Sequence, residues 1–126
     1  MEIDERFKEG LRLFKNGHYF ESHEVIEALW LETPEDDPWR DLYKGVIQAA
    51  AAIYQFKRGI LSGALGLYRS SVKYLEAYRP EAMGLQVGKL IEDMSVCFDE
   101  LNRSWGRGHV IIDMKKLPHP DFKFED

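Results

Sequence analysis

The chain has 126 residues, of which 44% are hydrophobic and 13% aromatic, so it can bury a core and is not an intrinsically disordered polymer. Acidic residues outnumber basic ones by 22 to 17, and the formal charge of −5 argues against non-specific binding to nucleic acid. The single cysteine, Cys97, excludes an intrachain disulfide and a cysteine-based zinc site.

Proline, glycine and the spacing of apolar residues divide the chain into five predicted helices. Asp4 can cap the first helix, and Gly17 ends it just before the second begins. Asp37 followed by Pro38 is typical of a helix start, so a third helix follows the linker TPEDDP. The expected helices cover about residues 4–16, 19–32, 38–58, 62–78 and 86–104.

The third predicted helix is apolar around most of its circumference, with a narrow polar side that includes Gln48. A helix of this kind belongs in the middle of a bundle. Gly45, Ala52 and Gly59 recur on it at seven-residue spacing. Since small residues leave room for a neighbouring backbone, we expect another helix to approach closely along this row.

The C-terminal stretch HVIIDMKKLPHPDFKFED has no helical spacing. Residues 110–112 can form a short extended segment that docks on the bundle or on a second copy, and Pro118 and Pro120 keep the end extended. We therefore predict an all-α, single-domain bundle of about five helices over residues 1–106, followed by an irregular, extended C-terminal tail over residues 107–126.

Two features favour a cytoplasmic location. The start MEIDERFKEG is acidic and amphipathic, unlike a signal peptide. No apolar run approaches the ~20 residues of a membrane-spanning helix. We expect neither a membrane nor nucleic acid as a partner.

The stretch GHYFESHEVIEALW places charged residues among large apolar ones in the second predicted helix. On a helical wheel, Tyr19 and Trp30 lie close together, and His23 falls in the same sector. Glu27 follows one turn after His23 and borders this face, and side chains four residues apart can touch. The sequence therefore predicts a His23–Glu27 pair turned toward the core.

Three interpretations of this pair stay open. In the first, His23, Glu27 and Gln48 form a hydrogen-bonded structural knot, since buried polar groups need partners. In the second, polar groups orient a small-molecule ligand in a pocket with aromatic walls from Tyr19, Trp30 and Tyr54.

The third interpretation is a metal centre. His23 and Glu27 have the spacing of the paired ligands in H-E-x-x-H zinc helices, with glutamate in place of the second histidine. Glu24 then occupies the position of the general base. No second motif of this kind is present in the sequence, and no cofactor can be named from it.

The same stretch resembles the DUF309 family, small bacterial and archaeal all-helical proteins of unknown function. The family pattern begins with Gly-x-Tyr-Phe-Glu-x-His-Glu-x-x-Glu-x-x-Trp, carried here by Gly17, Tyr19, Phe20, Glu21, His23, Glu24, Glu27 and Trp30. It continues with Gly45, Ile47, Gln48, Ala49 and Ala50, then Arg58-Gly59 and Gly63-Ala64. The chain departs from the pattern at Ile60, where asparagine is usual.

The resemblance covers about residues 7–78. It implies a small all-α bundle with a shared site around His23, Glu24, Glu27, Trp30 and Gln48, and it brings no established activity.

From these observations we expect a non-catalytic binding or interaction module with a small polar pocket formed by His23, Glu24, Glu27, Trp30, Gln48 and Tyr54. The alternative is a metal-dependent hydrolase that uses His23 and Glu27 as ligands and Glu24 as general base. A third hypothesis is a structural protein that forms a homodimer through exposed apolar surface or its tail.

Overall fold

Five α-helices and two short 3₁₀ turns make up the computed structural model, which describes residues 2–104 and 110–124. They are α1 (Glu5–Lys15), α2 (Tyr19–Leu31), α3 (Arg40–Lys57), α4 (Leu61–Leu75), η1 (Glu76–Tyr78), α5 (Val87–Arg103) and η2 (Met114–Lys116). The described residues form two isolated β-bridges and no strand. The predicted all-α class is therefore confirmed.

Aspartate side chains cap α1 and the turn that precedes α3. The Asp4 carboxylate accepts a hydrogen bond from the Arg6 backbone N–H at 2.8 Å, as predicted for an N-cap. The Asp37 carboxylate accepts from the Trp39 N–H at 2.8 Å, and the Arg40 N–H donates to the Asp37 carbonyl at 3.2 Å. Because Asp37 caps a separate turn, α3 begins at Arg40 instead of at residue 38.

The fourth predicted helix is an α-helix only as far as Leu75. Its last turn tightens into η1, and the Tyr78 hydroxyl donates to the Pro38 carbonyl at 2.6 Å. This bond ties the end of α4 to the linker before α3.

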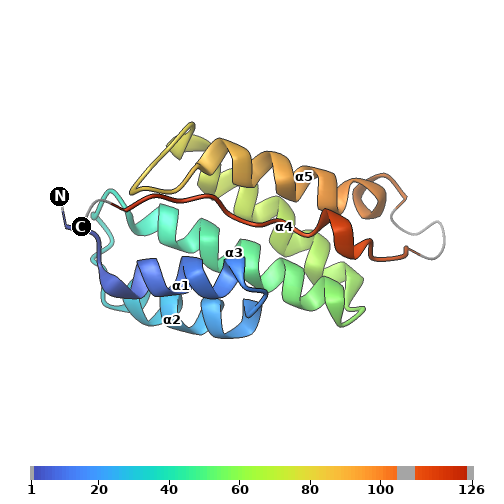
Figure 1. Ribbon diagram of the computed structural model, residues 1–126, viewed down its shortest axis with the longest axis horizontal. Helices are drawn as coiled ribbons and strands as arrows, with labels where there is room; N and C mark the ends of the chain where they lie inside the picture. The colour runs from blue at the N-terminus through green and yellow to red at the C-terminus, as the bar shows by residue number, and fades with distance from the viewer. Residues whose placement is uncertain (1, 105–109, 125–126) are drawn as a thin grey trace.

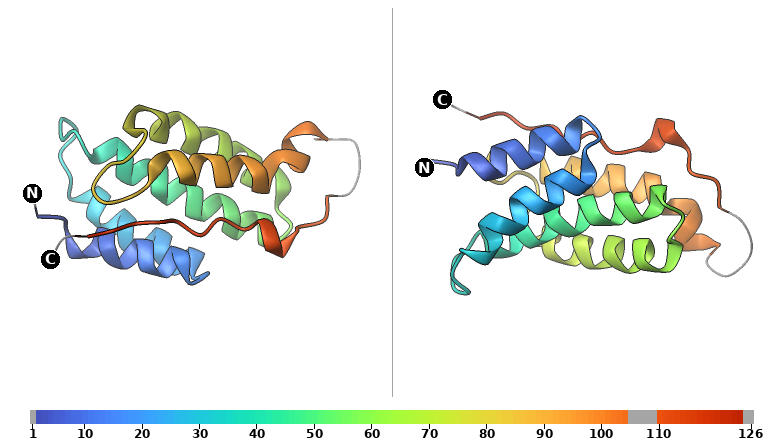
Figure 2. Two further views of the ribbon diagram at one scale, coloured as in Figure 1. Left: turned by 45° about the horizontal axis from the view of Figure 1, so that its top comes forward. Right: turned by 90° about the horizontal axis from the view of Figure 1, so that it is seen from below.

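Helix α3 occupies the middle of the bundle (Figure 1). It packs against both α2 and α4, while α1 packs on α2 and α5 packs on α4. Figure 2 shows the described part of the tail between α1 and α5, along one face of the molecule. The side of α3 that faces away from the tail is therefore not covered by it. None of the described helices is both long and apolar enough to cross a membrane.

Two glycines allow the helices to approach closely. A Cβ atom on Gly45 of α3 would lie 2.7 Å from Leu75 Cδ2 of α4, so the predicted close approach at this glycine is confirmed. A Cβ atom on Gly10 of α1 would lie 2.2 Å from Ile26 Cγ1 of α2. The same crossing is fixed by the buried Ser22 hydroxyl, which donates to the Gly10 carbonyl at 2.7 Å.

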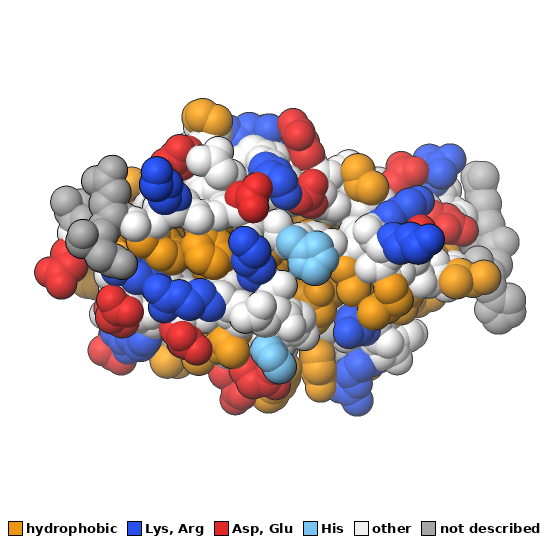
Figure 3. Space-filling model, viewed as in Figure 1, with side chains coloured by type: hydrophobic (Ala, Val, Ile, Leu, Met, Phe, Trp, Pro, Cys, Tyr) orange, Lys and Arg blue, Asp and Glu red, His pale blue; other side chains and the backbone are white. Residues whose placement is uncertain are grey.

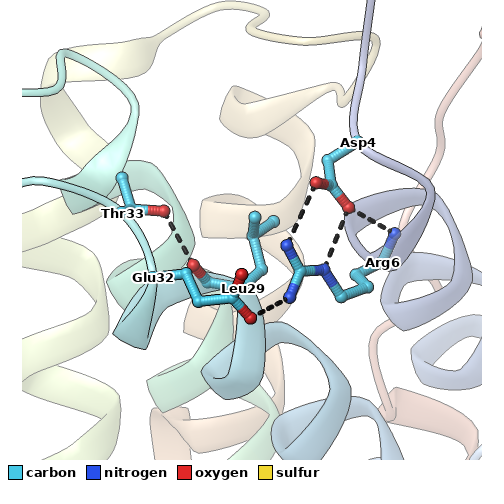
Figure 4. Close-up of polar contacts among 5 residues, drawn as sticks. All are labelled: Asp4, Arg6, Leu29, Glu32 and Thr33. Carbon is cyan, nitrogen blue, oxygen red and sulfur yellow. Dashed lines mark hydrogen bonds and ion pairs between the residues drawn. The ribbon is translucent and has the colours of Figure 1, made fainter.

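Ion pairs join the start of α1 to the end of α2 (Figure 4). The Arg6 guanidinium lies 3.2 Å from the Asp4 carboxylate and 2.6 Å from Glu32. The Thr33 hydroxyl donates to the Leu29 carbonyl at 2.7 Å and closes the last turn of α2. Glu32 is exposed to solvent and supports this junction through its contact with Arg6.

The described tail packs on its own bundle. An isolated bridge pairs Leu85 with Phe122, and the Lys123 N–H donates to the Gly84 carbonyl at 2.8 Å. The Lys15 ammonium lies 5.3 Å from the centre of the Phe122 ring. The predicted end of the fifth helix at Gly106 and Gly108 lies outside the described residues.

Candidate ligand site between α2 and α3

The predicted pair of His23 and Glu27 lies at the edge of the α2–α3 contact. His23 Nε2 is 3.2 Å from Glu27 Oε2, as expected for side chains one turn apart. The two side chains are 27% and 46% exposed, so they border the core without entering it.

His23 also forms one wall of a hollow of about 120 Å³ between α2 and α3. The hollow is lined by Phe20, His23, Ala51, Tyr54 and Gln55. The Phe20 and Tyr54 rings lie 5.2 Å apart, and the Phe20 and His23 rings lie 5.9 Å apart. An imidazole edge, an amide and two aromatic rings therefore meet in one concave place, which is the composition of many small ligand sites.

Phe20 and Tyr54 also border a second hollow, of about 200 Å³. Its other lining residues are Gly17, His18, Tyr19, Glu21 and Lys57. The Phe20–Tyr54 pair is therefore an aromatic ridge with a depression on each side. Burial raises the pKa of the Tyr19 phenol, so this hydroxyl stays protonated at neutral pH.

Three buried polar atoms between α2 and α3 have no hydrogen-bond partner within the described residues. They are the carbonyl oxygens of the Gln48 and Gln55 side chains and the indole nitrogen of Trp30. Buried polar groups normally have partners, and a site that awaits a ligand is one reason for an exception. In the part of the chain that the structure describes, the Gln48 side chain forms no hydrogen bond to His23 or Glu27, although the structural-knot interpretation requires one.

The remaining predicted site residues lie apart from the hollow. The Trp30 ring is covered by cations from α3, with Arg40 Cζ 4.3 Å and Lys44 Nζ 4.2 Å from its centre. Glu24 is exposed on the solvent side of α2. Of the six predicted residues, the structure brings His23 and Tyr54 to one hollow, with Glu27 beside them.

The donors needed for a metal centre do not converge here. Within residues 2–104 and 110–124, no three or more side chains of His, Cys, Asp or Glu are close enough to hold one ion. His23 and Glu27 therefore supply two protein donors, one fewer than the catalytic zinc sites of enzymes.

Cys97 lies away from this site, on α5. It is buried, and burial raises the pKa of its thiol to about 11. The thiolate fraction at neutral pH is therefore very small, as expected for a core cysteine.

The fold and the site together define a small all-α bundle with a polar-aromatic hollow between two helices. Residues 7–67 match the model of a domain of unknown function, DUF309. The resemblance inferred from the sequence motifs is confirmed.

A curated relative, the uncharacterized protein YpuF of Bacillus subtilis (strain 168), is 32% identical over 99 residues. The match covers 77% of this chain and 56% of the relative, so the chain spans little more than half of that protein's length.

Sequence reasoning missed three lining residues, the small Ala51 and the larger Phe20 and Gln55. Phe20 lies three residues before His23, so the two share a helix face. Gln55 lies seven residues after Gln48 and continues the same polar stripe of α3. The spacing therefore held the signal for both, although it could not show how far along the stripe the hollow lies.

Proposed function

We propose that the protein is a non-catalytic binding module, and that the hollow between α2 and α3 holds the ammonium end of an organic amine. The observation that carries this function is the Gln55 side chain, which lines the hollow and whose buried carbonyl oxygen has no hydrogen-bond partner among the described residues. Leaving a buried acceptor unpaired costs about 1–3 kcal/mol. A ligand N–H group that enters the hollow recovers this cost after a small rotation of the Gln55 side chain.

The aromatic ridge favours a positively charged ligand. Aromatic faces attract cations with about 0.5–2 kcal/mol, depending on how far the pair is desolvated. The Arg58 guanidinium already lies 5.4 Å from the centre of the Tyr54 ring, which supports cation binding at this ridge.

Carboxylates at the edge of the site act in the same direction. Glu27 contacts His23, Glu21 lines the neighbouring hollow, and Glu24 is exposed on the same helix. Together they outweigh Lys57 and Arg58 by one negative charge, which favours an amine over a carboxylate.

The alternative, a metal-dependent hydrolase based on His23 and Glu27, has less support because the described residues provide no third ligand beside the pair. We also propose that the module is cytoplasmic, since its single cysteine fits a reducing compartment.

An NMR titration of the untagged protein tests this function. With n-butylammonium chloride as the probe, we expect saturable shifts of the Phe20, His23 and Gln55 backbone amide signals, and potassium chloride at equal ionic strength serves as control. Tyr54→Leu should weaken binding about fivefold through loss of the ring. Tyr74→Leu on α4, outside the hollow, should leave the affinity unchanged.

Two outcomes would contradict the proposed function. One is a set of shifts that potassium chloride reproduces, which would indicate ionic screening alone. The other is stoichiometric binding of added zinc at His23 and Glu27 with no response to the amine, which would favour the hydrolase.

A further inference from the structure

A second hollow, unrelated to the α2–α3 site, lies between α5 and the tail and has a volume of about 230 Å³. Its lining residues are Lys89, Asp93 and Val96 of α5 and Lys115, Lys116, Leu117 and His119 of the tail. Figure 3 shows the face on which the tail lies, where basic side chains flank a histidine near the middle of the view. The hollow thus gathers cations in a chain whose formal charge is −5.

The cations of this hollow are only partly neutralised. The Lys89 ammonium lies 2.6 Å from the Asp93 carboxylate and 3.9 Å from the Asp121 carboxylate, so its charge is compensated. Lys115 and Lys116 are exposed, and no carboxylate of the described residues lies within ion-pair distance of either. The lining therefore keeps two uncompensated positive charges.

The two free lysines extend from an anchored turn. The Asp113 carboxylate accepts from the Lys115 N–H at 2.9 Å, and the Asp113 carbonyl accepts from the Lys116 N–H at 2.9 Å. The next residue, Leu117, is buried in the bundle with 8% exposure. Since the backbone of η2 is already ordered, a ligand that binds both lysines has little chain entropy to overcome.

The remaining lining residues are apolar or are held by polar contacts to the bundle. Val96 is 55% exposed although it is hydrophobic, and it faces the same hollow as Leu117. His119 Nδ1 lies 3.3 Å from the Lys15 carbonyl, and the His119 carbonyl lies 3.4 Å from the Lys89 ammonium. The hollow thus combines a charged end with an apolar wall.

We propose that this hollow binds a small phosphate monoester, with the Lys115 and Lys116 ammonium groups on the phosphate oxygens and the carbon part against Val96 and Leu117. Two free cations balance the nearly two negative charges of such a phosphate at neutral pH. A nucleic acid is a poorer match, because it needs a basic face that follows several phosphates. This site and the amine site use different residues, so either can fail without the other.

Titration of the full-length protein with glycerol 3-phosphate tests this site, followed by ¹H–¹⁵N NMR. We expect saturable shifts of the Val96, Lys116 and Leu117 amides and weaker binding of inorganic phosphate, which lacks the carbon part. The double variant Lys115→Gln/Lys116→Gln should bind about tenfold or more weakly. The control Lys73→Gln/Lys123→Gln removes the same charge from exposed positions outside the hollow and should change the affinity less than about twofold.

Three results would overturn this assignment. Equal weakening by both double variants would show that only the overall charge matters. Shifts that sodium chloride reproduces at the same ionic strength would show screening without a site. Tighter binding of a ten-nucleotide RNA, with shifts spread over several elements, would show a nucleic-acid surface instead.

Discussion

The unpartnered Gln55 carbonyl oxygen allows a ligand-binding role of this side chain to be distinguished from a structural role by stability alone. Less than 1 Å² of this oxygen is exposed, and it has no hydrogen-bond partner. In Gln55→Leu the unsatisfied acceptor disappears while a side chain of similar length stays between α2 and α3. We expect the free energy of unfolding to rise by about 1 kcal/mol, the lower end of the cost of burying an unpaired acceptor.

Urea denaturation at 25 °C measures this change, with the slope m expected to stay constant. A gain of about 1 kcal/mol corresponds to roughly 4 °C in the melting temperature of a domain of this size. Gln86→Leu is the control, because the exposed Gln86 side chain bonds only to Glu81 on the surface; its effect should stay within about 0.5 kcal/mol. A loss of 1 kcal/mol or more in Gln55→Leu would refute the reasoning, since it would mean that the amide belongs to a satisfied network.

Three further predictions concern the bundle. Gly45→Ala brings a Cβ to 2.7 Å from the fully buried Leu75 and should destabilise the protein by about 1–3 kcal/mol in urea unfolding; an unchanged midpoint would contradict the close α3–α4 packing. Cys97, with a pKa of about 11 and a buried side chain, should resist alkylation by iodoacetamide at pH 8 until urea unfolds the chain, and rapid labelling of the native protein would contradict this. Asp4→Ala should cost about 1 kcal/mol at pH 7 through loss of the N-cap. Because the hydrogen bond from Arg6 lowers the pKa of Asp4 in the folded protein, this stability difference should persist above pH 3.8 and shrink as the pH falls further. A stability difference that does not change at acidic pH would argue against the cap.

Helix patterning predicted most of the fold because its causes are local. Asp4, Gly17 and the apolar spacing around them act within one or two turns, and the structure has helices in all five predicted places. Gly45 was informative in the same way, since a small residue on a buried helix implies a close neighbour. The start of α3 was misplaced because Asp37 caps a separate turn at Trp39, which requires knowledge of the linker's conformation.

The site was only partly predictable from sequence. The His23–Glu27 pairing follows from spacing within one helix, and it is present. The depth of His23 and the position of the hollow depend on the distance and register between α2 and α3, which the sequence does not encode locally. Gln48 was therefore chosen as the polar partner where Gln55 lines the hollow.

The homodimer, the small-molecule ligand and the absence of nucleic acid or membrane partners stay predictions. The docking of the described tail on its own bundle is a finding of the structure, because its bridge to Leu85 depends on a contact between distant segments.

The most direct measurement is the set of intermolecular NOEs between bound n-butylammonium and the protein. We predict NOEs from the ligand's methylene protons to the ring protons of Phe20, Tyr54 and His23, and their loss in Tyr54→Leu. NOEs confined to other surfaces, or none at saturating probe, would contradict the assignment of the α2–α3 hollow as the binding site.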